Sequence, residues 1–276
     1  MHCLYLVATP IGNLEDITLR ALRLLKEVAL IAAEDTRKTG LLLKKYGIST
    51  PLCSYYEHSG ADKINYILKQ LETGDVAVVS EAGMPGISDP GYELVRAAVE
   101  KGVRVVPVPG PSASVSAVAV SGLPTDSFLF LGFLPRRQAE RKKVLAKNAA
   151  QTATLVIYEA PHRLKRTLSD IMQELGDRRI AVCREMTKIY EEVFRGTVSE
   201  AAEYFDDSKG EFTLVLEGLQ GTAGVNEACL HARLQEMKKA GMKAKDAVNI
   251  IARETDLKRR DIYRAWLRRI NKINHN

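Results

Sequence analysis

Short apolar runs alternate with longer amphipathic segments along the first 120 residues of the chain. Four apolar runs predict buried strands, at residues 4–8, 29–33, 76–79 and 103–106. Apolar residues at helical spacing predict helices between them, near residues 19–28, 41–46, 61–71 and 92–100. Strands that are apolar throughout and alternate with helices indicate a mainly parallel sheet that is covered on both faces.

The pattern changes after residues 122–125. From there strands are predicted at residues 128–133, 155–158, 180–184, 192–195 and 212–217, with helices at 140–148 and 161–175. Consecutive strands with fewer helices indicate a mixed α/β domain, and a linker-like stretch at 218–224 precedes a helical remainder. We therefore expect an α/β fold with an N-terminal domain at residues 1–122, a C-terminal domain at 123–220 and a helical extension at 221–276.

Charge sets the extension apart from the rest of the chain, whose net charge is +6. Residues 231–276 hold thirteen Lys and Arg against five Asp and Glu, a net +8, which leaves −2 for residues 1–230. A nearly neutral body with a basic tail indicates a polyanionic partner.

Several classes of protein lose support. No apolar run approaches the roughly 20 residues that cross a bilayer, and the N-terminus does not resemble a signal peptide, so we expect a cytoplasmic protein without a membrane partner. The four cysteines are scattered and the histidines form no metal-binding pattern, so no metal site is predicted. The glycine-rich dinucleotide motif and the P-loop motif are both absent, which argues against nicotinamide and P-loop nucleotide chemistry.

Four loops rich in proline, glycine and small residues follow predicted strands, at residues 9–13, 80–91, 108–113 and 132–135. Ligands of open α/β sheets bind beyond the carboxyl ends of the strands. Glycine lets the backbone approach a ligand closely, and proline fixes the chain direction. The loops therefore predict a ligand recognised mainly by backbone groups, such as a nucleoside with an amino-acid tail. For any single loop, a tight structural turn is the alternative.

Nine short motifs run in order through the two predicted domains. They are TPIGNL at 9–14, AEDTR at 33–37, GISDPG at 86–91, VPGPSA at 108–113, GLPT at 122–125, GFLP at 132–135, YEAPHR at 158–163, REMTK at 184–188 and GEF at 210–212. The set resembles the tetrapyrrole (corrin/porphyrin) methylase family over about residues 3–220. Within that family it is most similar to members that methylate the ribose 2′-hydroxyl of a cytidine in 16S ribosomal RNA.

The resemblance implies a two-domain α/β fold with S-adenosylmethionine in the cleft between the domains, commonly in a homodimer. It carries the cofactor-binding positions over to Pro10, Ile11, Gly83, Met84, Pro85, Ile87, Ser112, Ala113 and Phe212. The second loop departs from the family's usual Asp-Ala-Gly-Thr-Pro at Glu81 and Met84, and Ala160 stands where the family usually has Ser. Ser112 either offers its hydroxyl to a ligand carboxylate or caps a helix. Met84 either places a thioether near the cofactor or fills the core.

Methyl transfer to a ribose hydroxyl requires alignment of oxygen, methyl carbon and sulfur, and removal of the hydroxyl proton. The candidate proton acceptors are Glu81, Glu159, Glu185 and His162. Glu159 and Glu185 rank first because they lie in polar motifs at predicted strand ends. A structural ion pair is the alternative role for each carboxylate.

Basic residues in both the body and the extension are predicted to contact RNA phosphates: Arg37, Arg136, Arg137, Arg163, Arg259, Arg260 and Arg268. The extension is predicted to form a helix at 244–254, a short connection in which Asp256 is a candidate cap, and a further helix, with the spacing of a helix-turn-helix. The partner predicted is therefore 16S ribosomal RNA or the small ribosomal subunit.

Two other functions remain open at this point. One is a corrinoid- or siroheme-type methylase of the same fold that acts on a small molecule. The other is a non-catalytic RNA-binding assembly factor that has kept the fold.

Overall fold

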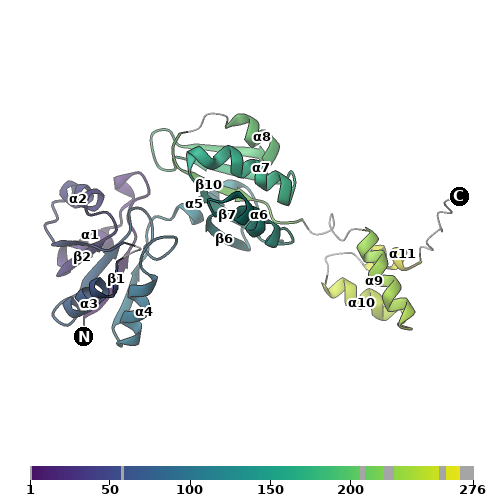
Figure 1. Cartoon of the computed structure of the whole chain (residues 1–276), viewed down its shortest axis with the longest axis horizontal. Coiled ribbons are helices and arrows are strands. Elements are labelled where there is room, and N and C mark those ends of the chain that lie inside the picture. The colour runs from purple at the N-terminus through teal and green to yellow at the C-terminus, as the bar shows by residue number, and fades with distance from the viewer. Residues whose placement is uncertain (1, 57–58, 206–208, 221–226, 255–258, 268–276) are drawn as a thin grey trace.

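The computed structural model of the chain contains two α/β domains followed by a helical extension (Figure 1). It describes residues 2–56, 59–205, 209–220, 227–254 and 259–267. No helix among these residues is long and apolar enough to span a membrane.

The first domain is built on a parallel five-stranded sheet in the order β3-β2-β4-β1-β5. Its strands are β1 (Cys3–Val7), β2 (Leu30–Ala33), β3 (Leu52–Ser54), β4 (Val76–Val79) and β5 (Arg104–Val108). Its helices are the short 3-10 turn η1 (Leu14–Asp16), α1 (Leu19–Glu27), α2 (Thr36–Lys45), α3 (Ala61–Gln70) and α4 (Tyr92–Glu100). The predicted parallel sheet is confirmed, and β3 is a short strand that the apolar pattern does not predict.

Helices cover both faces of this sheet. Successive strand residues point to opposite faces, so Ile31 of β2 packs with α1 and α2, whereas Leu30 packs with α3 and α4. All four residues of β2 and of β4 are consequently buried. This double burial explains why the strands are apolar throughout rather than alternating.

Helix α1 buries only part of the apolar set that the sequence pattern predicts for it. The helix begins after Thr18, whose side chain accepts a hydrogen bond from the N–H of Ala21. The apolar positions Leu19, Leu22, Leu25 and Val28 recur at three-residue steps, but Leu19 is 86% exposed whereas Leu25 and Val28 are buried. Ala21 and Leu24 are buried as well. Each three-residue step falls short of a full helical turn, so such positions drift around the helix.

The second domain holds a mixed sheet in the order β6-β7-β10-β8-β9, in which only β6 and β7 pair in parallel. Its strands are β6 (Phe128–Phe133), β7 (Thr154–Glu159), β8 (Arg179–Arg184), β9 (Glu192–Thr197) and β10 (Phe212–Leu216). Its helices are α6 (Gln138–Lys147), the 3-10 turn η2 (Pro161–Arg163), α7 (Leu164–Leu175) and α8 (Val198–Tyr204).

Helix α5 (Ala113–Ser121) packs against the second sheet rather than the first. Its Ala117 and Val118 join Val156, Ala181 and Val215 in one apolar cluster. Helices α6, α7 and α8 pack with the cluster on the opposite face. The predicted boundary at residue 122 therefore follows a helix of the second domain, and we propose the loop at residues 109–112 as the boundary.

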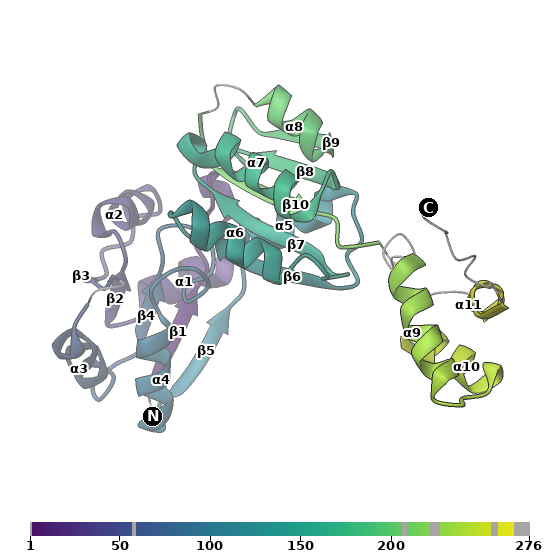
Figure 2. The ribbon, with the colours of Figure 1, turned by 45° about the vertical axis from the view of Figure 1, so that its right-hand side comes forward.

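The extension consists of α9 (Glu227–Lys239), α10 (Ala244–Glu254) and α11 (Arg259–Leu267), which contact one another. Leu234 of α9, Ile251 of α10 and Ile262 of α11 share a small core. In Figures 1 and 2 the three helices lie at one end of the molecule, apart from both sheets. The predicted cap Asp256 lies outside the described residues.

Candidate active site

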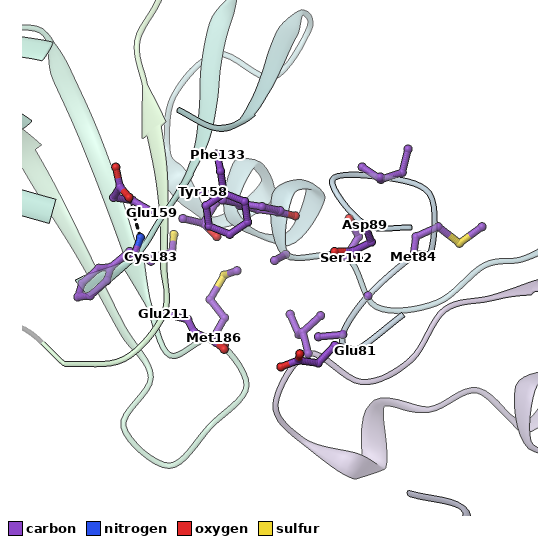
Figure 3. A pocket seen from close by; sticks show the side chains of 18 of the residues that line it. Glu81, Met84, Asp89, Ser112, Phe133, Tyr158, Glu159, Cys183, Met186 and Glu211 are labelled. Atoms are coloured by element: carbon purple, nitrogen blue, oxygen red, sulfur yellow. Dashed lines mark hydrogen bonds between the residues drawn. The ribbon is translucent and has the colours of Figure 1, made fainter. Parts of the chain in front are cut away.

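A cavity of about 400 Å³ lies between the two domains (Figure 3). Because β4, β1 and β5 are neighbours in the first sheet, the loops that follow them meet at one edge, together with the end of β2. The second domain contributes the ends of β6, β7 and β8 and the start of β10, which runs antiparallel to β7 and β8. The topology thus brings together segments that are far apart in the sequence.

Two close contacts join the domains next to residues that line the cavity. The N–H of Asn13 donates a hydrogen bond to Oγ1 of Thr187 at 3.0 Å. A Cβ added to the neighbouring Gly12 would lie 2.8 Å from the same oxygen. A Cβ added to Gly132 would lie 2.8 Å from Oγ of Ser88. At Gly12 a side chain would also meet the carbonyl of Met186 at 2.9 Å and push the walls apart, and at Gly132 a φ of 62° favours glycine.

Aromatic rings form part of the second-domain wall. The rings of Phe133 and Tyr158 pack edge to face with centroids 5.5 Å apart, and Phe130 packs against Tyr158 at 4.9 Å. The Tyr158 hydroxyl accepts a hydrogen bond from the N–H of Ser114 at 3.1 Å, which ties the ring to the first turn of α5. Phe133 lines the cavity and is 57% exposed, so it offers a flat apolar surface to a ligand.

The start of α5 also borders the cavity, through Ser112 and Ala113. The Ser112 side chain makes no capping hydrogen bond, and its Oγ lies 3.2 Å from Oγ of Ser114. Ser112 therefore does not cap the helix with its side chain, and the other role that the sequence left open, contact with a ligand carboxylate, stays a prediction. A hydroxyl beside the first N–H groups of a helix suits an anionic group such as a carboxylate.

Three carboxylates of the first domain, Glu34, Glu81 and Asp89, line the cavity. Oε2 of Glu34 accepts a hydrogen bond from the N–H of Glu81 at 3.0 Å, and the Glu81 carboxylate pairs with Lys38. Burial and the charge of Glu34 raise the pKa of Asp89 to about 6, against a hydrogen bond from the Ser80 side chain that lowers it. This group of acids suits a cationic ligand.

Glu159 lines the cavity, but it is only 2% exposed. Its Oε1 accepts a hydrogen bond from the N–H of Ala160 at 2.8 Å and lies 3.2 Å from Nε of Arg163. Its Oε2 accepts a hydrogen bond from Oγ1 of Thr167. Both oxygens therefore have partners within the protein, and they hold the turn between β7 and η2.

Glu185 lies beside the cavity but does not line it. Its Oε1 accepts hydrogen bonds from Nζ of Lys188 and from the N–H of Glu211, both at 2.9 Å. Burial favours a higher pKa for Glu185, but these hydrogen bonds and the charges of Lys188 and Arg184 outweigh it and lower the pKa. A carboxylate with a lowered pKa is a weaker proton acceptor, and His162 is exposed and also outside the lining.

The loops meet as the family resemblance implies. Seven of the nine expected cofactor positions line the cavity: Ile11, Gly83, Met84, Ile87, Ser112, Ala113 and Phe212. Pro10 and Pro85 are buried outside the lining, each next to a residue that lines it. Binding of the cofactor by these residues stays a prediction.

Sequence reasoning did not single out several lining residues, namely Glu34, Asp89, Phe133, Tyr158 and Glu211. All five lie inside motifs that carry the resemblance. The motifs show which segments meet, but they do not show which side chains of a segment turn toward the cavity.

The residues predicted to bind RNA occupy different environments. Arg163 is 14% exposed, and its Nη2 donates hydrogen bonds to the carbonyls of Leu134 at 2.7 Å and Pro135 at 3.2 Å. It therefore holds the loop after β6, and we do not propose it as a phosphate contact. Arg268 lies outside the described residues. The exposed ones are Arg37, Arg136, Arg137, Arg259 and Arg260.

Comparison with known proteins identifies the family. The model of the Tetrapyrrole (Corrin/Porphyrin) Methylases matches residues 3–202. A "Ribosomal RNA small subunit methyltransferase I" of Halalkalibacterium halodurans is 46% identical over 271 residues, which cover 95% of this chain and 94% of the relative. A protein of the same name from Thermotoga maritima is 52% identical over 221 residues, which cover 99% of the relative but 79% of this chain.

Solved structures share the fold at low sequence identity. A uroporphyrin-III-C-methyltransferase from Thermus thermophilus is 21% identical with a TM-score of 0.56, over 79% of this chain and 94% of the other. A diphthine synthase is 15% identical with a TM-score of 0.63, over 78% of this chain and 90% of the other. With its parallel first sheet, its mixed second sheet and the cavity between them, the chain belongs to the tetrapyrrole (corrin/porphyrin) methylase family.

Proposed function

We propose that the chain transfers a methyl group from S-adenosylmethionine to the ribose 2′-hydroxyl of a cytidine in small-subunit ribosomal RNA. The carrying observation is a cavity whose lining matches this cofactor in a chain that is 46% identical to a relative named as a small-subunit ribosomal RNA methyltransferase. The ribose position and the cytidine rest on the motif resemblance.

The cavity offers a partner for each chemical part of S-adenosylmethionine. Its volume, about 400 Å³, falls in the range of small-molecule sites. The Phe133 ring suits the flat adenine, the start of α5 at Ser112 suits the carboxylate, and the acids around Glu81 suit the ammonium and sulfonium charges. When bound, the cofactor supplies a methyl group that its sulfonium has already activated.

RNA is proposed to reach the cavity past exposed arginines on the same wall. Arg136 and Arg137 lie in the loop after β6, and both are exposed. The buried Arg141 donates hydrogen bonds to the carbonyls of Pro135 and Arg136, at 3.4 and 3.2 Å, and so holds this loop in place. The loop therefore carries two exposed arginines three and four positions after Phe133, which lines the cavity.

The proposal is tested by incubating the protein with small ribosomal subunits and isotopically labelled S-adenosylmethionine. The RNA is then digested to nucleosides and analysed by mass spectrometry, and labelled 2′-O-methylcytidine is expected. Label on a base would overturn the ribose assignment. Label in an added uroporphyrinogen but not in RNA would instead support the small-molecule methylase, and failure to bind the cofactor would support the non-catalytic assembly factor.

The basic extension is proposed to strengthen RNA binding. Replacing Arg259 and Arg260 by Gln, or deleting the chain from Asn226 onward, should weaken RNA binding and flatten its salt dependence, by about one unit of slope for each lost phosphate contact. Cofactor binding should persist. Filter binding at several salt concentrations measures the slope, and an unchanged slope would exclude the extension from RNA binding. The homodimer and the cytoplasmic location stay predictions.

A further inference from the structure

The carboxylates that line the cavity differ in how they are compensated. Glu81 pairs with Lys38, Glu211 pairs with Lys188 at 2.9 Å, and Glu159 lies against Arg163 with donors on both oxygens. These three side chains are already held by other groups of the protein. The remaining lining acids are Glu34 and Asp89.

Glu34 has a positioning contact of its own, since its Oε2 accepts the N–H of Glu81 at the start of the loop after β4. Asp89 is different. It is half-buried, and the charged group that acts on its pKa is the negative Glu34. Among the described residues, no Lys or Arg forms an ion pair with Asp89.

Asp89 lies next to a backbone position of unusual conformation at the boundary between the domains. The preceding residue, Ser88, has a φ of 62°, a conformation that side chains other than glycine seldom adopt. Its Oγ packs directly on Gly132 of the second domain. Such strain persists where the surrounding structure imposes it, and it clusters at functional sites. Asp89 thus follows a strained backbone position whose side chain contacts the second domain.

We propose that Asp89 is the proton acceptor of the reaction, a role that rests on the proposed function. In the step, an electron pair of the ribose oxygen forms the new bond to the methyl carbon, and the carbon–sulfur bond breaks with its electron pair left on sulfur. The hydroxyl proton passes to a carboxylate oxygen of Asp89 and then to water. No further reactant is needed.

The electrostatics of the site agree with this role. A proton acceptor works best when its pKa lies close to the working pH. Burial and the charge of Glu34 bring the pKa of Asp89 to about 6. Glu34 at the end of β2 is the charged group acting on it, while Glu81 on the same wall is neutralised by Lys38.

The first experiment compares Asp89→Asn with Asp62→Asn, an exposed aspartate in the first turn of α3. Asp89→Asn should lower the turnover of RNA methylation on the order of 100-fold or more, and calorimetry should show a much smaller loss of affinity for S-adenosylmethionine, because Glu34 and Glu81 still line the cavity. Asp62→Asn should match the unchanged protein in both measurements. Equal activity of Asp89→Asn would overturn the proposal, and so would an equal loss of cofactor binding and turnover, which would make Asp89 a binding residue.

The second experiment uses pH and does not depend on the Asn variant folding. Turnover of the unchanged protein should fall as the pH drops through about 6. Glu34→Gln removes the neighbouring negative charge. The acidic limb of the turnover profile should therefore move to lower pH. The titration of Asp89 in the free protein, which NMR of labelled carboxyl carbons follows, should move in the same direction. A limb that stays in place would contradict the role of Asp89. If the unchanged protein methylates no RNA, the proposed function itself is overturned. If the Asp89→Asn variant methylates RNA with equal activity, only the role of Asp89 is overturned.

Discussion

Buried carboxylates of the second domain have surroundings different from those of two half-buried carboxylates of the first domain. In the second domain, Asp170 is fully buried and paired with Arg141 at 2.6 Å, and Glu159 has partners on both oxygens. In the first domain, Glu34 and Asp89 lie close enough for one to raise the pKa of the other. Compensated charges serve the fold, whereas like charges that border a cavity cost stability and are typical of functional sites.

Removing a compensated charge from the second domain should have the largest effect on stability. Asp170→Ala leaves Arg141 buried without its partner and also removes the acceptor of Gln138. The free energy of unfolding should fall by about 3–5 kcal/mol. Urea denaturation measures this, and Asp126→Ala, at an exposed position, serves as the control. A loss as small as that of the control would contradict the structural role of the pair.

Glu159 and Glu81 both line the cavity and allow a direct comparison of the two walls. Glu159→Gln should lower the free energy of unfolding by about 2 kcal/mol, because it disturbs a buried, fully bonded carboxylate. Glu81→Gln breaks a partly exposed pair with Lys38 and should cost under about 1 kcal/mol. Denaturation of both variants provides the test. A larger loss of unfolding free energy for Glu81→Gln than for Glu159→Gln would contradict the structural role given to Glu159.

Asp89→Asn should raise the free energy of unfolding slightly, and only at pH values above the ordinary carboxyl pKa of 3.8. The pKa of Asp89 is higher in the folded protein, about 6, than its ordinary 3.8. The folded state therefore binds the proton more tightly, and ionisation destabilises it as the pH rises through this range. The shift corresponds to at most about 3 kcal/mol, which partial exposure reduces to about 1 kcal/mol.

The measurement for this variant is thermal or urea unfolding at pH 7.5 and near pH 4. Asn mimics the neutral acid, so the variant should be more stable at pH 7.5, and the difference should be small near pH 4 and vanish below the ordinary pKa of 3.8, where Asp89 is protonated in both states. A destabilised variant at pH 7.5 would mean that the Asp89 charge supports the fold.

The sequence predicted the fold well because buried parallel strands leave a continuous apolar signal. Residues 76–79 and 92–100 are β4 and α4 as expected. It predicted the cavity through loops that follow strands, since strand order then brings these loops to one edge. The short β3 and the exposed Leu19 were not predicted, because local spacing does not show how an element packs.

The site was harder to predict at the level of side chains. Glu185 lies in a polar motif at a strand end, yet a positive φ of 50° and the contact with Lys188 place it outside the cavity lining. Asp89 and Glu34 come close to each other only because two loops, over fifty residues apart in the chain, meet in the fold. Such a pair has no signature in the local pattern of either loop.

The central claim, that the cavity between the domains binds S-adenosylmethionine, is tested most directly by calorimetry. The unchanged protein should bind the cofactor, and Phe133→Ala should weaken binding by the roughly 1–3 kcal/mol that stacking on an aromatic ring contributes. Phe128→Ala, at an exposed ring on the same strand outside the lining, should bind as tightly as the unchanged protein. Absence of binding to the unchanged protein, or equal affinity of Phe133→Ala, would contradict the account.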